Sequence, residues 1–159
     1  MLKPFLLACA TMAALGCRSP APEPASSRKP EDDAREVEAV LHRWYDASEK
    51  HDSAGWTDAT LPGYFILEDT TVYDKPTLDR LVIESFAMGT DRVKLYDFKT
   101  AVSGDVAWTT FRNDEVWTPN GGKPEAPRRF LESAVFRRVD GRWRLERYHA
   151  TRINREPAQ

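Results

Sequence analysis

The stretch Asp140-Gly-Arg-Trp-Arg-Leu-Glu-Arg-Tyr-His149, continued by Ala150 and Thr151, decides the fold. Asp-Gly is a common hairpin turn, and the residues after it alternate as in a long strand. In an unbroken strand, one face would carry every second side chain, namely Trp143, Leu145, Arg147, His149 and Thr151. An apolar row that ends in a guanidinium, an imidazole and a hydroxyl predicts the floor of a pocket.

The preceding strand, Arg128 to Val139, leaves two registers open for this hairpin. If Asp140-Gly141 form a two-residue turn, Glu132 lies opposite His149, and the two could form an acid/base pair. If Gly141 forms a bulge instead, Leu131 lies opposite His149, and Glu132 faces outward or into a dimer contact. The Xaa-Asp-Gly sequence favours the bulged form.

Helical and strand periodicities divide the rest of the folded part. An amphipathic helix is expected from Glu36 to His51, a short helix from Asp52 or Ser53 to Pro62, and a third from Asp74 to Gly89. Strands are expected at residues 64–67, 70–73, 92–102, 106–118, 128–139 and 142–153. A slip of the apolar phase within 92–102 predicts a β-bulge that curves the sheet.

Three helices followed by four long antiparallel strands predict an α+β fold. We expect a cone-shaped, curved antiparallel sheet with the three N-terminal helices packed on its concave face. The open outer face would need cover, and Phe111, Trp117 and Tyr148 are candidates for it, so a homodimer is expected.

Residues 1–17 have the pattern of an export signal. Lys3 gives a basic start, an apolar run from Phe5 to Leu15 is too short to span a bilayer, and Ala14-Leu-Gly-Cys17 closes it. This resembles a bacterial lipoprotein signal, although an ordinary secretory signal is the alternative. The resemblance implies lipidation of Cys17 and a membrane anchor in the cell envelope, on the periplasmic side of the outer membrane because no aspartate follows the cysteine.

The rest of the sequence limits which domains and binding partners are expected for the chain. Residues 18–30, rich in proline and serine, predict a disordered tether, and residues 31–155 one domain. The formal net charge is −2, and the basic residues form no single stripe, so nucleic acid is not expected as a partner. Cys9 lies in the removed segment and Cys17 would be lipidated, so no disulfide is expected. No phosphate loop or nucleophile elbow is present.

Three short patterns in order carry a family resemblance: Gly-Asp-Val-Ala at 104–107, Asp-Gly-Arg-Trp at 140–143, and His149-x-Thr151. Together they resemble the nuclear transport factor 2-like superfamily, in particular its SnoaL-like and ketosteroid-isomerase-like domains. The resemblance implies the cone-shaped fold described above. Members include isomerases, cyclases, dehydratases and proteins that only bind or oligomerise, so the fold leaves the activity open.

The isomerase branch uses a tyrosine, a protonated acid and a proton-carrying aspartate. Alignment to that branch puts Trp44 at the tyrosine position, while Tyr45 lies about 100° round the helix and is a poor substitute. The proton carrier maps to Asp69, although a solvated turn is the preferred interpretation of that position, and the third acid falls at Glu132 or Ser133. The missing tyrosine argues against isomerase chemistry.

Candidate ligand contacts follow from these expectations. An aromatic wall would come from Trp44, Trp56, Tyr64, Phe86 and Trp108, with Arg147 and Thr151 at its polar end. His42 and His51 are out of phase on one helix, so no metal set is recognised and no cofactor is expected.

Three functions fit these candidates. The preferred one is a lipid-anchored envelope protein that binds a small apolar or amphipathic molecule, or assembles through its sheet, without established catalysis. An alternative is an isomerase, cyclase or dehydratase in which His149 works with Asp69 or Glu132 as proton carriers, and Arg147 stabilises an oxyanion. His149 could also be a hydrogen-bonded wall residue, and the domain an accessory protein-interaction module.

Overall fold

A computed structural model describes residues 29–153 of the chain. The expected signal segment with Cys17, the tether up to residue 28, and residues 154 and 155 of the expected domain lie outside the described residues. Among the described residues, no helix is both long and apolar enough to span a membrane.

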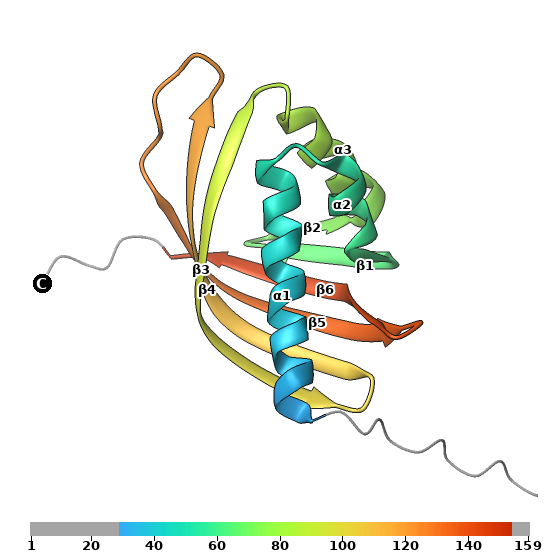
Figure 1. Cartoon of the computed structure of the whole chain (residues 1–159). Helices are drawn as coiled ribbons and strands as arrows, with labels where there is room; N and C mark the ends of the chain where they lie inside the picture. The colour runs from blue at the N-terminus through green and yellow to red at the C-terminus, as the bar shows by residue number, and fades with distance from the viewer. Residues whose placement is uncertain (1–28, 154–159) are drawn as a thin grey trace, which may run out of the picture.

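The described part is an α+β domain built from one mixed sheet and helices that pack on one side of it (Figure 1). The sheet has six strands in the order β2-β1-β6-β5-β4-β3 and is not closed into a barrel. Strands β1 and β6 pair in parallel, and the other pairs are antiparallel. The predicted fold class is confirmed, with one parallel pair that was not expected. The elements are α1 (Pro30–Glu49), α2 (Ser53–Asp58), β1 (Thr60–Glu68), β2 (Thr71–Asp74), α3 (Lys75–Ser85), β3 (Gly89–Ser103), β4 (Val106–Pro119), β5 (Arg128–Val139) and β6 (Arg142–Arg152).

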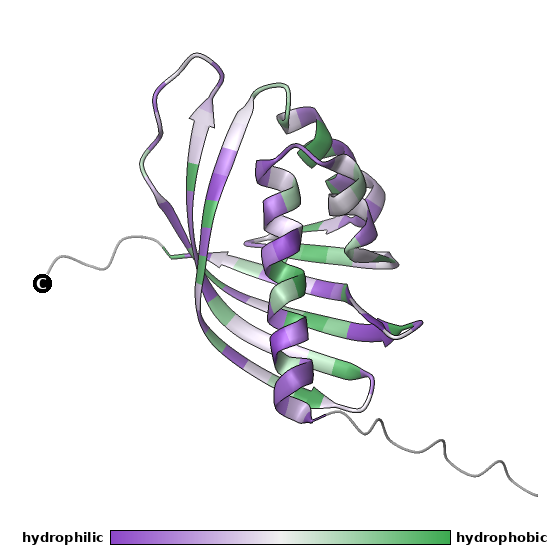
Figure 2. Cartoon of the chain, in the orientation of Figure 1, coloured by the Kyte–Doolittle hydropathy of each residue, from purple (hydrophilic) through white to green (hydrophobic). Residues whose placement is uncertain are grey.

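Helix α1 crosses the concave face of the sheet and closes the core (Figure 1). It begins at Pro30 rather than at Glu36, because proline suits the first helical turn and three acidic residues there complement the helix dipole. Its buried stripe includes Val37, Leu41 and Trp44. Figure 2 shows hydrophobic and hydrophilic residues alternating along α1.

A buried ion pair fixes the N-terminal end of α1 on the sheet. Arg138 Nη2 on β5 lies 2.6 Å from Asp33 Oδ1, and both side chains are largely buried. The guanidinium also stacks 4.4 Å from the ring centroid of Trp143 on β6. Because both charges are largely desolvated, loss of Arg138 would leave Asp33 uncompensated, whereas Arg138 also lies 3.7 Å from the exposed Asp105.

The predicted bulge in β3 is confirmed. The pairing of β3 with β4 shifts register between Tyr96 and Lys99, and Asp97 within the shift has a φ of 58°. A bulge increases the local twist and bends the strand. This bend lets the long β3–β4 pair curve around α1.

The β5–β6 hairpin adopts neither of the two expected registers along its whole length. Its turn is the two-residue form, since Val139 pairs with Arg142 and Asp140 and Gly141 have positive φ angles of 52° and 74°. A bulge at Glu146 then moves the register by one residue, so that Ser133 lies opposite His149. The preference for a bulged turn was therefore wrong, because the bulge lies further along the strand.

The bulge at Glu146 also reverses the faces of the last part of β6. Tyr148 and Ala150 are buried, whereas Arg147, His149 and Thr151 are exposed on the outer face. The predicted common face with Trp143 and Leu145 is therefore wrong for these three residues.

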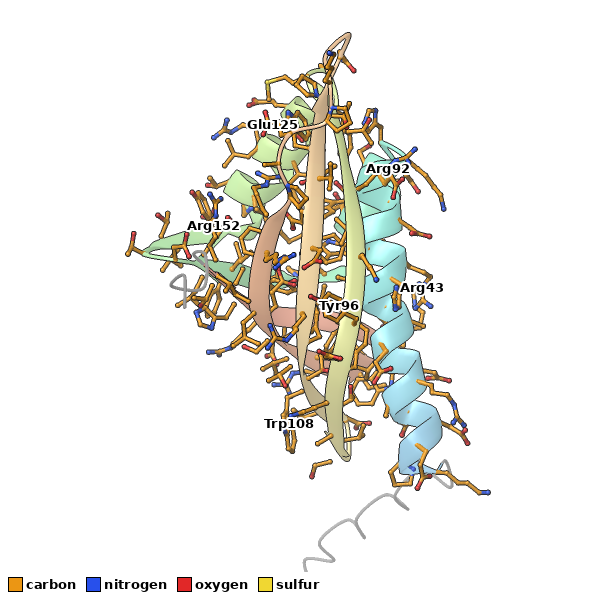
Figure 3. All side chains as sticks on the ribbon, turned by 90° about the vertical axis from the view of Figure 1, so that its left-hand side faces the viewer. Arg43, Arg92, Tyr96, Trp108, Glu125 and Arg152 are labelled. Atoms are coloured by element: carbon orange, nitrogen blue, oxygen red, sulfur yellow. The ribbon has the colours of Figure 1, made fainter. Side chains whose placement is uncertain are left out.

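The outer face of the sheet also differs from the expectation. Phe111 and Tyr148, expected there, belong to the buried core, and Trp117 lines an internal cavity. Trp108 lies on the outer face instead, with 47% of its surface exposed, on the side of the sheet away from α1 (Figure 3).

Candidate functional site

A partly open cavity of about 230 Å³ lies between α1, α3 and the concave face of the sheet. One side of it is aromatic, formed by Trp44, Trp56, Phe86 and Trp117. Trp44 and Trp56 stack with their ring centroids 4.2 Å apart, which makes a rigid wall. Polar side chains from β3, β4, β5 and β6 complete the lining.

Glu132 on β5 is the central polar group of the cavity. Its side chain is 3% exposed and accepts a short hydrogen bond from the hydroxyl of Tyr148. The hydroxyl of Tyr45 lies 2.6 Å from that of Tyr148 and 3.4 Å from Glu132 Oε1. Two phenols from α1 and β6 therefore meet one carboxyl group from β5.

The amide of Asn113 connects this group to a second carboxyl group. Asn113 Nδ2 lies 3.1 Å from Glu132 Oε1, 3.1 Å from the Tyr45 hydroxyl and 2.7 Å from Glu115 Oε1. Asn113 is completely buried. Because an amide nitrogen carries two hydrogens, it cannot satisfy all three acceptors at once.

Burial and, to a smaller extent, the charge of Glu115 raise the pKa of Glu132, whereas hydrogen bonds from Tyr148, Asn113 and Tyr45 lower it. The net result is a pKa of about 8. Glu132 is therefore mainly protonated at neutral pH. Burial and the nearby acids also raise the pKa of both tyrosine hydroxyls well above 10. All three groups consequently hold protons and can donate hydrogen bonds.

Glu115 is linked through Arg128 to a third acid, Asp91, at the edge of the cavity. Burial raises its pKa to about 7, with a further contribution from Asp91, while Arg128 and Asn113 oppose the shift. Arg128 Nη2 lies 2.9 Å from Asp91 Oδ2 and 3.5 Å from Glu115 Oε2. Glu132 and Glu115 thus carry different pKa values in the same cavity, although both are glutamates.

The indole nitrogen of Trp44 is a buried donor without an acceptor among the described residues. Trp56, stacked on it, donates from its own Nε1 to Asp79 Oδ1 at 3.1 Å. An unsatisfied buried donor costs about 1–3 kcal/mol. Since Trp44 lines the cavity, a hydrogen-bond acceptor placed there could satisfy it.

The structure brings four predicted site residues to this cavity: Trp44, Trp56, Phe86 and Glu132. Tyr64 lies behind the wall, with its ring edge against Trp44 at 6.0 Å. Its position is in the buried core rather than among the residues that line the cavity.

The other predicted residues lie elsewhere. His149 is exposed, and its Nε2 lies 3.2 Å from the Thr151 hydroxyl. The guanidinium carbon of Arg147 lies 5.1 Å from the ring centroid of Phe65. Asp69 is a turn residue with a φ of 50°, and its Oδ1 accepts a hydrogen bond from the Arg152 backbone. His149 and Glu132 occupy opposite faces of the sheet, so they cannot exchange a proton directly.

Sequence reasoning missed Tyr45, Asn113, Glu115, Tyr148 and the Asp91–Arg128 pair. A signal for two of them was present, because Phe111, Asn113, Glu115 and Trp117 recur with the period of two that places them on one face of β4. Tyr45 was considered a poor candidate because of its angle around the helix. Its hydroxyl nevertheless lies 3.4 Å from Glu132 Oε1 and 2.6 Å from the Tyr148 hydroxyl.

A second hollow is larger but chemically plainer. It is an open groove of about 730 Å³ between α1, α2 and the β5–β6 turn. Its ionic residues pair at the surface, as Arg144 does with Asp58 at 3.1 Å. No cluster of three metal-ligating side chains occurs in either hollow or elsewhere in residues 29–153. The smaller cavity is therefore the candidate site, because it combines enclosure with buried titratable groups.

Comparison with known proteins agrees with this architecture. A conserved protein from Planctomyces limnophilus has 19% identity and a TM-score of 0.69, covering 77% of this chain and 98% of its own. A candidate dehydratase of the NTF2-like family from Streptomyces avermitilis has 19% identity and a TM-score of 0.70, with coverage of 80% and 100%. A ketosteroid isomerase-like protein from Erwinia carotovora has 15% identity and a TM-score of 0.63, with coverage of 78% and 98%. At these identities the likeness concerns the fold alone.

No curated protein matches the chain. The model of the SnoaL-like domain family matches residues 37–153, which include the helices, the sheet and the cavity. The chain therefore belongs to the SnoaL-like domain family, within the NTF2-like fold.

Proposed function

We propose that this protein binds a small amphipathic molecule in the cavity between α1, α3 and the sheet. The observation that carries the proposal is the buried carboxyl group of Glu132, which contacts Tyr45 and Tyr148 beside the stacked rings of Trp44 and Trp56 in one cavity. Buried polar groups next to apolar rings suit a ligand with a polar group on a flat apolar body.

The volume of the cavity limits the size of this ligand. An apolar cavity of about 150 Å³ is enough to hold benzene, and this cavity measures about 230 Å³. One or two fused rings with a short polar arm would fit, whereas a four-ring skeleton would require the walls to move.

Thermal unfolding of residues 29–159 tests the proposal with phenol, 2-phenylethanol, 2-indanone and cyclohexenone as probes. Saturable stabilisation by at least one probe is expected. Ala150→Leu places bulk on the cavity side of β6 and should abolish the stabilisation. His149→Leu is the matched control, because it adds apolar volume one residue away on the outer face. Equal responses of the two variants would refute the proposed site.

A second candidate function is proton transfer next to a carbonyl group. It is favoured by two buried carboxyl groups in one cavity, Glu132 and Glu115, whose pKa values are raised to about 8 and about 7, close to neutral pH. Ionised Glu115 would take a proton from the carbon beside the carbonyl, and the electron pair would move to the carbonyl oxygen. Glu132 and Tyr148 would stabilise that oxygen, and the proton would return from Glu115 to carbon.

Hydrogen exchange measures this reaction directly. In D2O, catalysed deuterium uptake at the carbons beside the 2-indanone carbonyl would be followed by proton NMR. Glu115→Gln should reduce the catalysed rate by about 100-fold or more, while His149→Ala should leave it unchanged. Binding without catalysed exchange would leave the protein as a binder.

We also propose that Cys17 is lipidated and holds the domain at the periplasmic side of the outer membrane, and that the domain forms a homodimer through its outer sheet face. The sequence of residues 1–17 supports the anchor. Cys17→Ser should release the protein from the membrane fraction, and mass spectrometry of the wild-type N-terminus should detect acyl chains.

Sedimentation of residues 29–159 would test the proposed homodimer, with exposed Trp108 and Leu131 as the residues to substitute.

A further inference from the structure

We propose that the cavity's ligand carries a positively charged amino group, held where Asp91 and Glu115 meet the ring of Trp117. The inference rests on the proposed binding function and adds the chemical class of the ligand, an organic ammonium ion on a small apolar body. Three independent features of the cavity lead to it: its charge, an unpaired oxygen and the position of an aromatic ring.

The charged groups that line the cavity are mostly acidic. Glu68, Asp91, Glu115 and Glu132 contribute carboxyl groups, and Arg128 contributes the one guanidinium. Arg128 is already engaged, since its Nη2 lies 2.9 Å from Asp91 and 3.5 Å from Glu115. One cation therefore serves several acids, and an anionic ligand would add to the repulsion between them.

One carboxylate oxygen at this end has no donor. Asp91 Oδ2 contacts Arg128, but Asp91 Oδ1 is buried and accepts no hydrogen bond from any described residue. A buried acceptor left unpaired is unfavourable, and more so when it is charged. An ammonium group brings up to three N–H donors together with the compensating charge.

An aromatic residue, Trp117, lies across from Asp91 and lines the same cavity. Trp117 on β4 is the direct cross-strand partner of Asp91 on β3, and directly opposed residues point to the same face of a sheet. The ring approaches Gly89 so closely that a Cβ there would lie 2.6 Å from Trp117 Cζ2. An ammonium ion next to a tryptophan face and a carboxylate gains cation–π and ionic attraction together.

The protonation of Glu115 supports the same ligand class. Its pKa of about 7 means that part of the population is protonated at neutral pH. The charged and polar groups that face it are Asp91 from β3, Arg128 and Glu132 from β5, Asn113 from β4 and Glu68 from β1, with Glu125 acting on Asp91. An ammonium ion favours ionised Glu115, so binding should release protons and tighten as the pH rises from 6 to 8.

Calorimetry with three probes of similar shape tests the class at pH 7.5: 2-phenylethylamine, 2-phenylethanol and 3-phenylpropanoate. The amine should bind at least tenfold more tightly than the alcohol, which corresponds to about 1.4 kcal/mol, and the carboxylate should bind most weakly. Buffers with different heats of ionisation should reveal proton release with the amine alone. Alcohol binding equal to or tighter than amine binding would overturn the inference.

Variants separate this inference from the proposed function. Glu115→Gln should weaken amine binding about tenfold or more relative to alcohol binding measured in the same variant. Glu84→Gln is the control, since that carboxylate is exposed on α3 and pairs with Arg80. If Glu115→Gln fails to fold, Asp91→Asn should show the same selective loss. Alcohol binding without amine binding refutes only the ligand class, whereas failure of all probes in the wild type refutes both proposals.

Discussion

The phenolic oxygens of Tyr45 and Tyr148 lie 2.6 Å apart, although one belongs to α1 and the other to β6. Both tyrosines also contact Glu132 on β5. This contact joins the N-terminal helix to the C-terminal hairpin inside the cavity. The two hydroxyls are the structural reason that a carboxyl group can remain buried there.

Removal of these hydroxyls should reveal their coupling. Tyr45→Phe and Tyr148→Phe should each lower the free energy of unfolding by about 1–3 kcal/mol, because each leaves a buried partner without its hydrogen bond. In a double-mutant cycle measured by urea unfolding, the coupling should exceed about 0.5 kcal/mol. Tyr96→Phe, which removes an outer hydroxyl that bonds to Asp114 at 3.0 Å, provides a control. Strict additivity of the two buried changes would contradict the network.

Glu132 should make the protein less stable as the pH rises. The folded protein holds this proton with a pKa of about 8, compared with 4.5 for the ordinary group, so unfolding releases it between these values. Stability due to Glu132 should therefore fall from about pH 5 to pH 8, by on the order of 3 kcal/mol. Glu132→Gln should flatten this dependence, leaving the smaller part due to Glu115. An unchanged pH profile, measured by urea unfolding with Glu84→Gln as reference, would argue against a buried neutral acid.

The two faces of β6 should respond differently to substitution. His149→Ala should change the free energy of unfolding by less than about 0.5 kcal/mol, since the imidazole is exposed. Tyr148→Ala, one residue earlier, should cost about 3–5 kcal/mol, because it removes a ring that is 2% exposed. Guanidinium chloride unfolding measures both. A large cost for His149→Ala would place that residue inside the core and contradict the bulge at Glu146.

The Asp33–Arg138 ion pair should be necessary for the docking of α1. Asp33→Asn or Arg138→Met alone should cost about 3–5 kcal/mol, because a buried charge loses its partner. The double variant should be more stable than the sum of the two losses predicts. Arg80→Met, which breaks an exposed pair with Glu84 at 3.2 Å, should cost less than about 1 kcal/mol. Similar costs for the buried and exposed pairs would contradict this role.

Most of the fold could be predicted from the sequence because its elements have clear periods. The stripe of Val37, Leu41 and Trp44 identified α1, and the phase slip before Phe98 identified the β3 bulge. The start of α1 was missed because residues 30–35 are polar, and helix formation there depends on proline and acidic residues rather than on an apolar stripe. The parallel pairing of β1 with β6 depends on contacts between distant segments.

The site was harder to predict because one extra residue in β6, the bulge at Glu146, decides which side chains face the cavity. Trp143 and Leu145 fit an unbroken alternation to His149, and only the pairing with β5 reveals the bulge that turns Tyr148 inward. Glu132 was recognised as a candidate, but its partner was expected to be His149. Asn113 and Glu115 were overlooked because polar residues on a strand are usually taken to face solvent.

The carboxyl 13C chemical shift of Glu132 is the most direct test of the account, measured by NMR at pH 7 while 2-phenylethanol or 2-phenylethylamine is added. The account predicts a protonated carboxyl group in the free protein, since its pKa is about 8, and a saturable change of the signal as a ligand fills the cavity. Ala150→Leu should abolish that change. An ionised carboxylate that responds to neither probe would contradict a ligand site built around Glu132.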